Sequence, residues 1–252
     1  MKVIFSKVLH SKTGLAASLV TASVLGMTVL APSAQAFNLV PSAEGEIKTK
    51  DLGCLTGNDC FELDSNIFSS VTSEIDDSTG TRSYLFVDRK GTQNTYNDTV
   101  NGGTFTFGAV DSGTTESTEH YWFRPVAVNP DGSLIEGGEL EVGTFTFEFT
   151  RMLSELNLSF FDTERSGTTS YSINGGDFVT IASGPDANIQ DVALTDVKTI
   201  TLNLGERFGR TGDGVNFNGT ASVPEPSLVL GALAATAGGA VFRKRRQAQS
   251  EA

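Results

Sequence analysis

Two carboxylates separated by one residue are the first groups in this sequence whose types and spacing could perform chemistry. Asp162 and Glu164 lie in the segment FFDTE, next to two phenylalanines. Side chains two residues apart lie on the same face of a strand. A pair of carboxylates is what glycoside hydrolysis requires, so these two are candidates for a glycosidase pair. We favour the alternative of a polar strand end, because the turn sequence RSGT follows directly.

A second group of oxygen-bearing side chains lies in the segment DGVNFN. Asp213, Asn216 and Asn218 offer the oxygen ligands that calcium prefers. The segment lacks the spacing of an EF-hand and its terminal glutamate. An ordinary turn rich in Asp and Asn explains the same residues. We therefore assign no metal site and no cofactor, and keep calcium as the one candidate ion.

The sequence contains two cysteines, Cys54 and Cys60, in the segment CLTGNDC. Outside the cytoplasm, a close and even pair indicates a disulfide around a short loop. A zinc site would need further ligands, and the sequence has no histidine nearby. We expect a Cys54–Cys60 disulfide.

Other enzyme classes find little support in the sequence. It contains neither a Gly-x-Ser-x-Gly elbow nor a His-Glu-x-x-His motif. His120 has no evident partner that would orient it as a general base. Trp122 beside Tyr121 could form a platform for a sugar, although filling the core explains a tryptophan equally well. We expect a protein that is not an enzyme.

The elements that position these groups are predicted to be strands, because apolar and polar residues alternate with a period of two. The segments 143–150, 156–161 and 199–204 show this alternation, and the first of them reads GTFTFEFT. Turn-forming sequences recur between such segments. We expect an all-β domain, an antiparallel sandwich of the jelly-roll-like or immunoglobulin-like kind.

Three local features sharpen this expectation. Asn174-Gly175 predicts a tight turn between the two arms of a hairpin. Pro125 predicts an edge strand or a bulge, because proline cannot donate a ladder hydrogen bond. The segment RMLSEL, residues 151–156, is the one stretch that could form a turn of helix.

The first 36 residues have the three parts of a secretory signal peptide. Three lysines precede an uncharged run at residues 15–30, and the small residues Ala34 and Ala36 follow. This order predicts that signal peptidase cuts between Ala36 and Phe37. The alternative is an uncleaved membrane anchor, which would not require the small-residue site.

An uncharged run at residues 227–242 precedes four cations, Arg243, Lys244, Arg245 and Arg246. As a helix this run spans about 24 Å, and the hydrocarbon core is about 30 Å thick. Local thinning and flanking cations can accommodate a short span. The positive-inside rule places the four cations in the cytoplasm, as a basic anchor. The alternative is a buried helix of a soluble fold.

The segment VPEPSLVLGALAATAGGAVFRKRRQ resembles a PEP-CTERM sorting signal, which has a Pro-Glu-Pro motif, an apolar helix and a basic end. Bacteria that export such proteins have an exosortase, a membrane enzyme that cuts near the motif. The resemblance implies that Pro224, Glu225 and Pro226 are recognised by an exosortase-type enzyme. It implies a membrane tether before processing, and a place at the cell surface or outside the cell afterwards.

A second resemblance rests on the string Leu-Glu-Val-Gly at residues 140–143. The LEVG family of PEP-CTERM proteins, found mainly in cyanobacteria, is named for this string. The segment NLSFFDTE, residues 157–164, is also similar to strands of related exported sandwiches. The resemblance implies no particular reaction, and its context suggests association with exopolysaccharide.

The charge of the body limits the partners that it can bind. The chain has 18 basic and 30 acidic residues. Removing the leader and the residues after Pro226 takes away seven cations and one acid, which leaves 11 basic and 29 acidic residues, a net charge of −18. Such a charge disfavours nucleic acid and anionic lipid.

These observations predict four parts of the chain. They are a signal peptide at 1–36, an exported sandwich at 37–221, a sorting signal at 222–247 with its transmembrane helix at 227–242, and a polar tail at 248–252. We expect a non-enzymatic protein of the cell surface or extracellular matrix. A calcium-assisted lectin-like module and a glycosidase are the alternatives.

Overall fold

The computed structural model describes residues 35–57, 60–108, 121–209 and 211–224. In these ranges the regular structure consists of antiparallel strands and one helical turn, η1 (Ile135–Gly138). No helix in the described ranges is long and apolar enough to cross a membrane. The expected signal helix and the expected helix at 227–242 lie outside the described residues.

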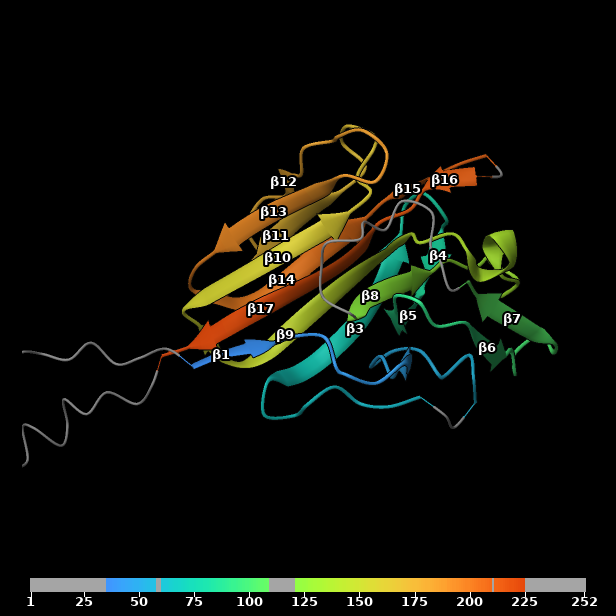
Figure 1. Cartoon of the computed structure of the whole chain (residues 1–252), viewed down its shortest axis with the longest axis horizontal. Helices are drawn as coiled ribbons and strands as arrows, with labels where there is room; N and C mark the ends of the chain where they lie inside the picture. The colour runs from blue at the N-terminus through green and yellow to red at the C-terminus, as the bar shows by residue number, and fades with distance from the viewer. Residues whose placement is uncertain (1–34, 58–59, 109–120, 210, 225–252) are drawn as a thin grey trace, which may run out of the picture. The chain divides into compact units, whose positions relative to one another are not determined.

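The first sheet has seven strands, in the order β13–β10–β17–β8–β5–β2, with β1 paired to β17 beside this path (Figure 1). Its strands are β1 (Gln35–Asn38), β2 (Gly45–Ile47), β5 (Tyr84–Arg89), β8 (Tyr121–Val126), β10 (Glu155–Phe161), β13 (Ile189–Leu194) and β17 (Asn216–Val223). The last strand in the described residues, β17, therefore lies near the middle of this sheet.

The second sheet has six strands, in the order β12–β11–β14–β9–β3–β4. Its strands are β3 (Phe68–Asp76), β4 (Thr81–Arg82), β9 (Gly143–Leu153), β11 (Ser170–Ile173), β12 (Val179–Thr180) and β14 (Val197–Leu204). The segments predicted from alternation at 143–150, 156–161 and 199–204 fall in β9, β10 and β14, so these predictions are confirmed.

The core lies between the two sheets and is rich in phenylalanine. The apolar face predicted for residues 143–150 is buried, and Phe147 of β9 contacts two rings of the first sheet. Its ring centroid lies 5.7 Å from that of Phe123 and 5.8 Å from that of Phe217. Since one apolar cluster joins both sheets, the predicted all-β antiparallel sandwich is confirmed.

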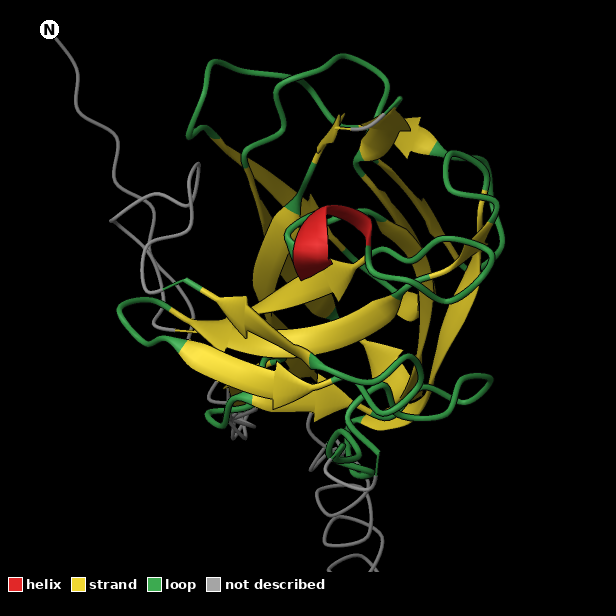
Figure 2. Ribbon diagram, turned by 90° about the vertical axis from the view of Figure 1, so that its right-hand side faces the viewer, coloured by secondary structure: helices red, strands yellow, loops and turns green. Residues whose placement is uncertain are grey.

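Two further pairs of strands lie outside the main sheets. They are β6 (Asn94–Asn97) with β7 (Thr104–Phe107), and β15 (Glu206–Phe208) with β16 (Thr211–Asp213). The β6–β7 hairpin covers Phe86 of β5, whose ring centroid lies 5.0 Å from that of Tyr96. This contact belongs to a second apolar cluster. Figure 2 shows the helical turn η1 in front of the strands, at one end of the sandwich.

The predicted turn at Asn174-Gly175 is present. Both residues have positive φ, 53° and 73°, and the Gly176 N–H donates to the Ile173 carbonyl at 2.9 Å. Only residues 170–171 of β11 pair with residues 179–180 of β12. The hairpin is therefore confirmed, although its second arm is short.

Two local predictions are wrong. Segment 151–156 belongs to the end of β9 and the start of β10, not to a helical turn. Strand β8 lies between β17 and β5, so Pro125 is not in an edge strand. The pairing of β8 with β17 consists of Phe123 with Phe217, whereas its pairing with β5 extends past Pro125. Pro125 thus lies where β8 pairs on one side alone, which is where a missing N–H is tolerated.

Candidate functional site

Three carboxylates converge at the end of β10. Asp162 directly follows this strand, Glu164 lies two residues further, and Asp186 comes from the loop before β13. One ligand oxygen from each lies within 4.8 Å of the other two. The structure therefore brings the predicted pair together and adds Asp186, which the sequence did not indicate. We call these three residues the acidic corner.

Asp162 is a carboxyl of the acidic corner with a perturbed pKa. Burial raises its pKa to about 6, and repulsion from Glu164, Asp186 and Asp213 acts in the same direction. The backbone N–H of Ala187 donates to Asp162 Oδ1 at 2.8 Å and partly offsets this rise in pKa. A close group of carboxylates relieves its repulsion either by keeping a proton or by binding a cation.

The calcium candidates chosen from the sequence do not form one ligand group with the acidic corner. Asp213 accepts from the segment that follows β10 on both carboxylate oxygens. Its Oδ2 accepts from the backbone N–H of Arg165 at 3.1 Å and from the Thr168 hydroxyl at 2.7 Å, and its Oδ1 accepts from the backbone N–H of Glu164 at 3.4 Å. Asn216 and Asn218 are buried in β17, opposite Phe161 and Ser159 of β10. Asp213 therefore holds a turn in shape, and calcium binding by these three stays a prediction.

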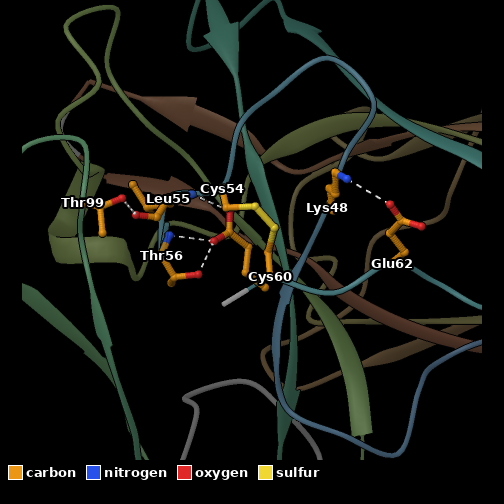
Figure 3. Close-up of a disulfide and its surroundings, with 8 residues drawn as sticks. Lys48, Cys54, Leu55, Thr56, Cys60, Glu62 and Thr99 are labelled. Atoms are coloured by element: carbon orange, nitrogen blue, oxygen red, sulfur yellow. Dashed lines mark hydrogen bonds and ion pairs between the residues drawn. A yellow bond between two sulfur atoms is a disulfide. The ribbon is translucent and has the colours of Figure 1, made fainter. Parts of the chain in front are cut away.

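The Cys54–Cys60 disulfide is present, with Cα atoms 5.9 Å apart, so that prediction is confirmed. It closes a short loop, residues 54–60, which we call the disulfide loop (Figure 3). Leu55 of this loop is buried in the second apolar cluster. The Thr99 backbone N–H and hydroxyl both donate to the Leu55 carbonyl, each at 2.8 Å.

A buried carboxylate holds the disulfide loop against β2. Glu46 accepts hydrogen bonds from the Leu55 N–H at 2.7 Å, the Thr56 N–H at 2.8 Å and the Thr56 hydroxyl at 2.6 Å. Burial raises the pKa of Glu46, while the bonds from Thr56 and Leu55 oppose that rise. The disulfide therefore joins the two ends of the loop, and Glu46 holds its first residues after Cys54.

A second buried charge, Arg124 of β8, lies beneath the β6–β7 hairpin. Its guanidinium is 0% exposed and forms ion pairs with Asp88 at 3.0 Å, Glu139 at 2.5 Å and Glu141 at 2.5 Å. It also lies 4.2 Å from the ring centroid of Phe107. Buried charges are tolerated where they are paired in this way. The cluster joins β5 and β8 to the chain that enters β9.

Each position of the Leu-Glu-Val-Gly string has a structural constraint. Leu140 and Val142 are buried in a small apolar cluster. Glu141 pairs with the buried Arg124. Gly143 begins β9, and a Cβ there would lie 2.8 Å from the Cβ of Ser83, closer than carbon atoms approach. Each residue of the string therefore has a packing or charge contact within the fold.

The sugar platform considered at Trp122 is wrong. Trp122 is 3% exposed, so it fills space beneath the surface, and Tyr121 is half-buried. His120 lies outside the described residues. Large aromatics in strands are commonly buried, which is why the sequence left both roles open.

Sequence reasoning missed a cleft of about 450 Å³ beside Phe178. We call it the Phe178 cleft. It is lined by Ile75, Asp76, Asp77, Ser78, Thr144, Gly167, Thr168, Ser170, Phe178, Asn203, Gly205 and Glu206. These residues come from distant parts of the sequence, so no local pattern could reveal it. None of the acidic-corner residues lines this cleft.

Of the processing residues predicted at the two ends, the structure describes Ala36, Phe37 and Pro224. Ala36 and Phe37 are in β1, opposite Ser222 and Ala221 of β17. Strand β17 ends at Val223, and Pro224 follows as an exposed residue. Both strands extend two residues beyond the boundaries expected for the sandwich, 37 and 221. Ala34, Glu225, Pro226 and the cations at 243–246 lie outside the described residues.

Comparison with protein-family models finds no family that matches this chain, and no curated protein matches it.

Proposed function

We propose that this chain is an exported, non-enzymatic protein of the cell surface or extracellular matrix, delivered by a cleaved leader and processed at its tail. The pairing of β1 with β17 is the observation that supports this most. It sets Gln35 opposite Val223, so both predicted cutting points lie at one place on the sandwich. A folded body whose leader has already been removed can be held at a membrane by its tail junction and released by a cut there.

The proposal includes the machinery that the sequence motifs imply. Signal peptidase removes residues 1–36, and an exosortase-type enzyme acts at Pro224–Pro226, as in the PEP-CTERM proteins of the LEVG family. Before that step the helix at 227–242 tethers the protein, with its four cations in the cytoplasm. Exopolysaccharide is the partner that this location offers.

For the sandwich itself we propose the jelly-roll-like arrangement rather than the immunoglobulin-like one. Strands β9, β10, β11, β13, β14 and β17 fall alternately in the two sheets. The chain therefore crosses from sheet to sheet repeatedly, as in a jelly roll.

A variant of the tail tests the processing route. In a bacterium that exports the full chain, Glu225→Ala should leave the leader cut intact and keep the tail, so the protein stays in the membrane fraction. The wild-type chain should lose its tail. Equal recovery of both proteins, full length and in the cytoplasm, would overturn the proposal.

Calcium binding is the second candidate function, and the acidic corner is the observation that favours it. Calcium binds several oxygen ligands, and the acidic corner provides three carboxylates from two loops. Millimolar CaCl2 should raise the Tm of the wild-type protein and should not raise that of Asp186→Asn. An equal rise in the two proteins, or none in the wild type, would exclude the corner as a calcium site.

The glycosidase alternative rests on the raised pKa of Asp162, which a general acid needs. Asp162→Asn should abolish glycan turnover if this pair were catalytic. Our proposal predicts that neither the wild type nor the variant releases reducing ends from any glycan tested.

A further inference from the structure

The Phe178 cleft combines two exposed apolar side chains with a polar floor. Phe178 is 56% exposed and Ile75 is 60% exposed, and both line the cleft. Strand β12, which follows Phe178, is itself exposed. An exposed ring beside a concave surface is a feature of binding sites, because its burial by a ligand removes apolar area from water.

The floor of the cleft is held in shape by hydrogen bonds. The Thr144 hydroxyl donates toward Asn203 Oδ1 at 3.0 Å and Asp76 Oδ2 at 3.2 Å. The Ser78 hydroxyl donates to Asp76 Oδ1 at 2.5 Å and accepts from the Arg207 N–H at 3.2 Å. These residues belong to different strands and turns, so the polar groups are placed before a ligand arrives. Preorganisation of this kind lowers the entropy lost on binding.

A glycine closes the cleft tightly against the neighbouring chain. Gly205 has a φ of +65°, and a Cβ there would lie 2.0 Å from the Asp213 carbonyl oxygen. Asp213 in turn holds Thr168, another lining residue, through its hydroxyl at 2.7 Å. The wall between β14 and β15 therefore has little freedom to move.

The charges of the lining indicate the kind of ligand. Asp76, Asp77 and Glu206 are acidic, and none of the described lining residues is Lys or Arg. The body as a whole is also strongly acidic. An anionic ligand would be repelled, whereas a neutral ligand with many hydroxyls would find carboxylate, amide and hydroxyl groups to bond. An amine on the ligand would gain further attraction from Glu206 and Asp77.

A second cleft, of about 420 Å³, does not share these features. Its lining includes Lys48, Lys50, Glu62 and Glu148, so charges of both signs are present. Its aromatic residue, Phe68, is 5% exposed and already belongs to the core. It therefore lacks an exposed ring for a ligand to cover.

We propose that the Phe178 cleft binds a glycan without negative charge, either neutral or amine-bearing. The Phe178 ring packs against the C–H face of one sugar, and the floor at Thr144 and Asn203 bonds the hydroxyls of that sugar or its neighbour. Glu206 favours chains that carry an amine. This assignment rests on the proposed function in one respect, which is that a protein at the cell surface or outside the cell would encounter such a glycan.

Binding is tested with protein purified from cells that express the full chain. Calorimetric titrations use four probes: a glucosamine hexamer, an N-acetylglucosamine hexamer, cellohexaose and polyguluronate. At least one of the first three should bind, and polyguluronate should not. Phe178→Ala should weaken that binding at least tenfold, since stacking is lost. Glu206→Gln should weaken binding of the glucosamine hexamer more than it weakens binding of the neutral probes.

The matched control is Phe208→Ala, because Phe208 is also an exposed ring and does not line the cleft. It should bind like the wild type. Equal affinity of Phe178→Ala and wild type, binding of polyguluronate alone, or no binding of any probe would each overturn the assignment. Conversion of a dimer to a monomer by Phe178→Ala, with no effect on sugars, would overturn it in favour of a protein interface.

The two proposals fail in distinguishable ways. A processed and exported protein that binds none of the probes overturns the glycan assignment and leaves the export route in place. A full-length cytoplasmic protein that binds the probes through Phe178 overturns the export route and leaves the glycan assignment in place.

Discussion

Individual carboxylates in this protein have roles that their burial and neighbours decide. Asp213 holds a turn by accepting from Arg165 and Thr168. Glu46 holds the disulfide loop. Asp162 differs from both, because it accepts a hydrogen bond from the backbone N–H of Ala187 while burial, helped by repulsion from three acids, raises its pKa to about 6. Its ionisation therefore opposes folding, unlike that of an ordinary surface acid.

Asp162→Asn should stabilise the protein above pH 6. A folded-state pKa raised above the ordinary value of 3.8 means that stability is greatest below pH 3.8 and is lost as pH rises through 6. Asparagine tolerates the positive φ of 64° and can still accept from Ala187. Solvent screening limits the gain to about 1 kcal/mol, or roughly 2–4 °C in Tm.

Thermal unfolding at pH 7.5 and pH 4.0 checks this prediction. The difference in Tm between the variant and the wild type should be clear at pH 7.5 and should vanish at pH 4.0. A stabilisation of the same size at both values would mean that ionisation of Asp162 is not its cause.

At this scale the sequence predicted the pair Asp162 and Glu164 from their spacing, although the strand that was expected to align them ends at Phe161 and Asp162 has a positive φ of 64°. It could not predict Asp186, which approaches from a loop more than twenty residues away. It also could not separate Asp213 as a turn-holding acid from a calcium ligand. Both roles require an oxygen-rich side chain beside glycine, and the partners that decide between them are distant in sequence.

Among the elements, the sequence predicted several strands correctly, but it did not predict what connects them or which strands lie side by side. Strands β9, β10 and β14 were predicted because one face of each must be apolar. The helical turn expected at 151–156 was wrong because sheet pairing outweighed local helix propensity. The sequence did not predict that β8 lies inside the sheet. Strand β8 pairs with β17 through one residue pair, Phe123 with Phe217, and so short a pairing leaves no pattern in the sequence.

The disulfide loop is an element whose removal should be measurable. Cys54→Ser should lower the free energy of unfolding by about 2 kcal/mol, because the unfolded chain regains the entropy of a short loop. That corresponds to a fall in Tm of roughly 4–8 °C. Cys60→Ser and the double variant should match it, since each removes the same bond. A wild-type Tm unchanged by reductant would contradict the prediction.

The Leu-Glu-Val-Gly string should tolerate no side chain at its glycine. Gly143→Ala places a methyl group against Ser83 and Phe145 and should cost about 1–3 kcal/mol. Gly53→Ala is the matched control, because no atom lies within 4 Å of the added carbon. Urea unfolding of both variants should show a loss of stability at Gly143 alone. Equal stability of the two variants would show that the contact is relaxed without cost.

Across the whole molecule, the described chain is a sandwich whose first and last strands are neighbours in one sheet (Figure 1). A leader cut between Ala36 and Phe37 would remove residues that pair with Ser222 and Val223. The cut is therefore expected before β17 joins β1, while the leader is still unpaired. The proposed tail cut would fall after β17 and could follow folding. This order lets one body be delivered, folded and then processed.

The mass of the intact native protein tests the central claim most directly. Protein recovered outside the cytoplasm should begin at Phe37, end close to Pro226 and lack the two hydrogen atoms lost in forming the disulfide. A cytoplasmic protein with the mass of the full 252-residue chain and two free thiols would contradict the account.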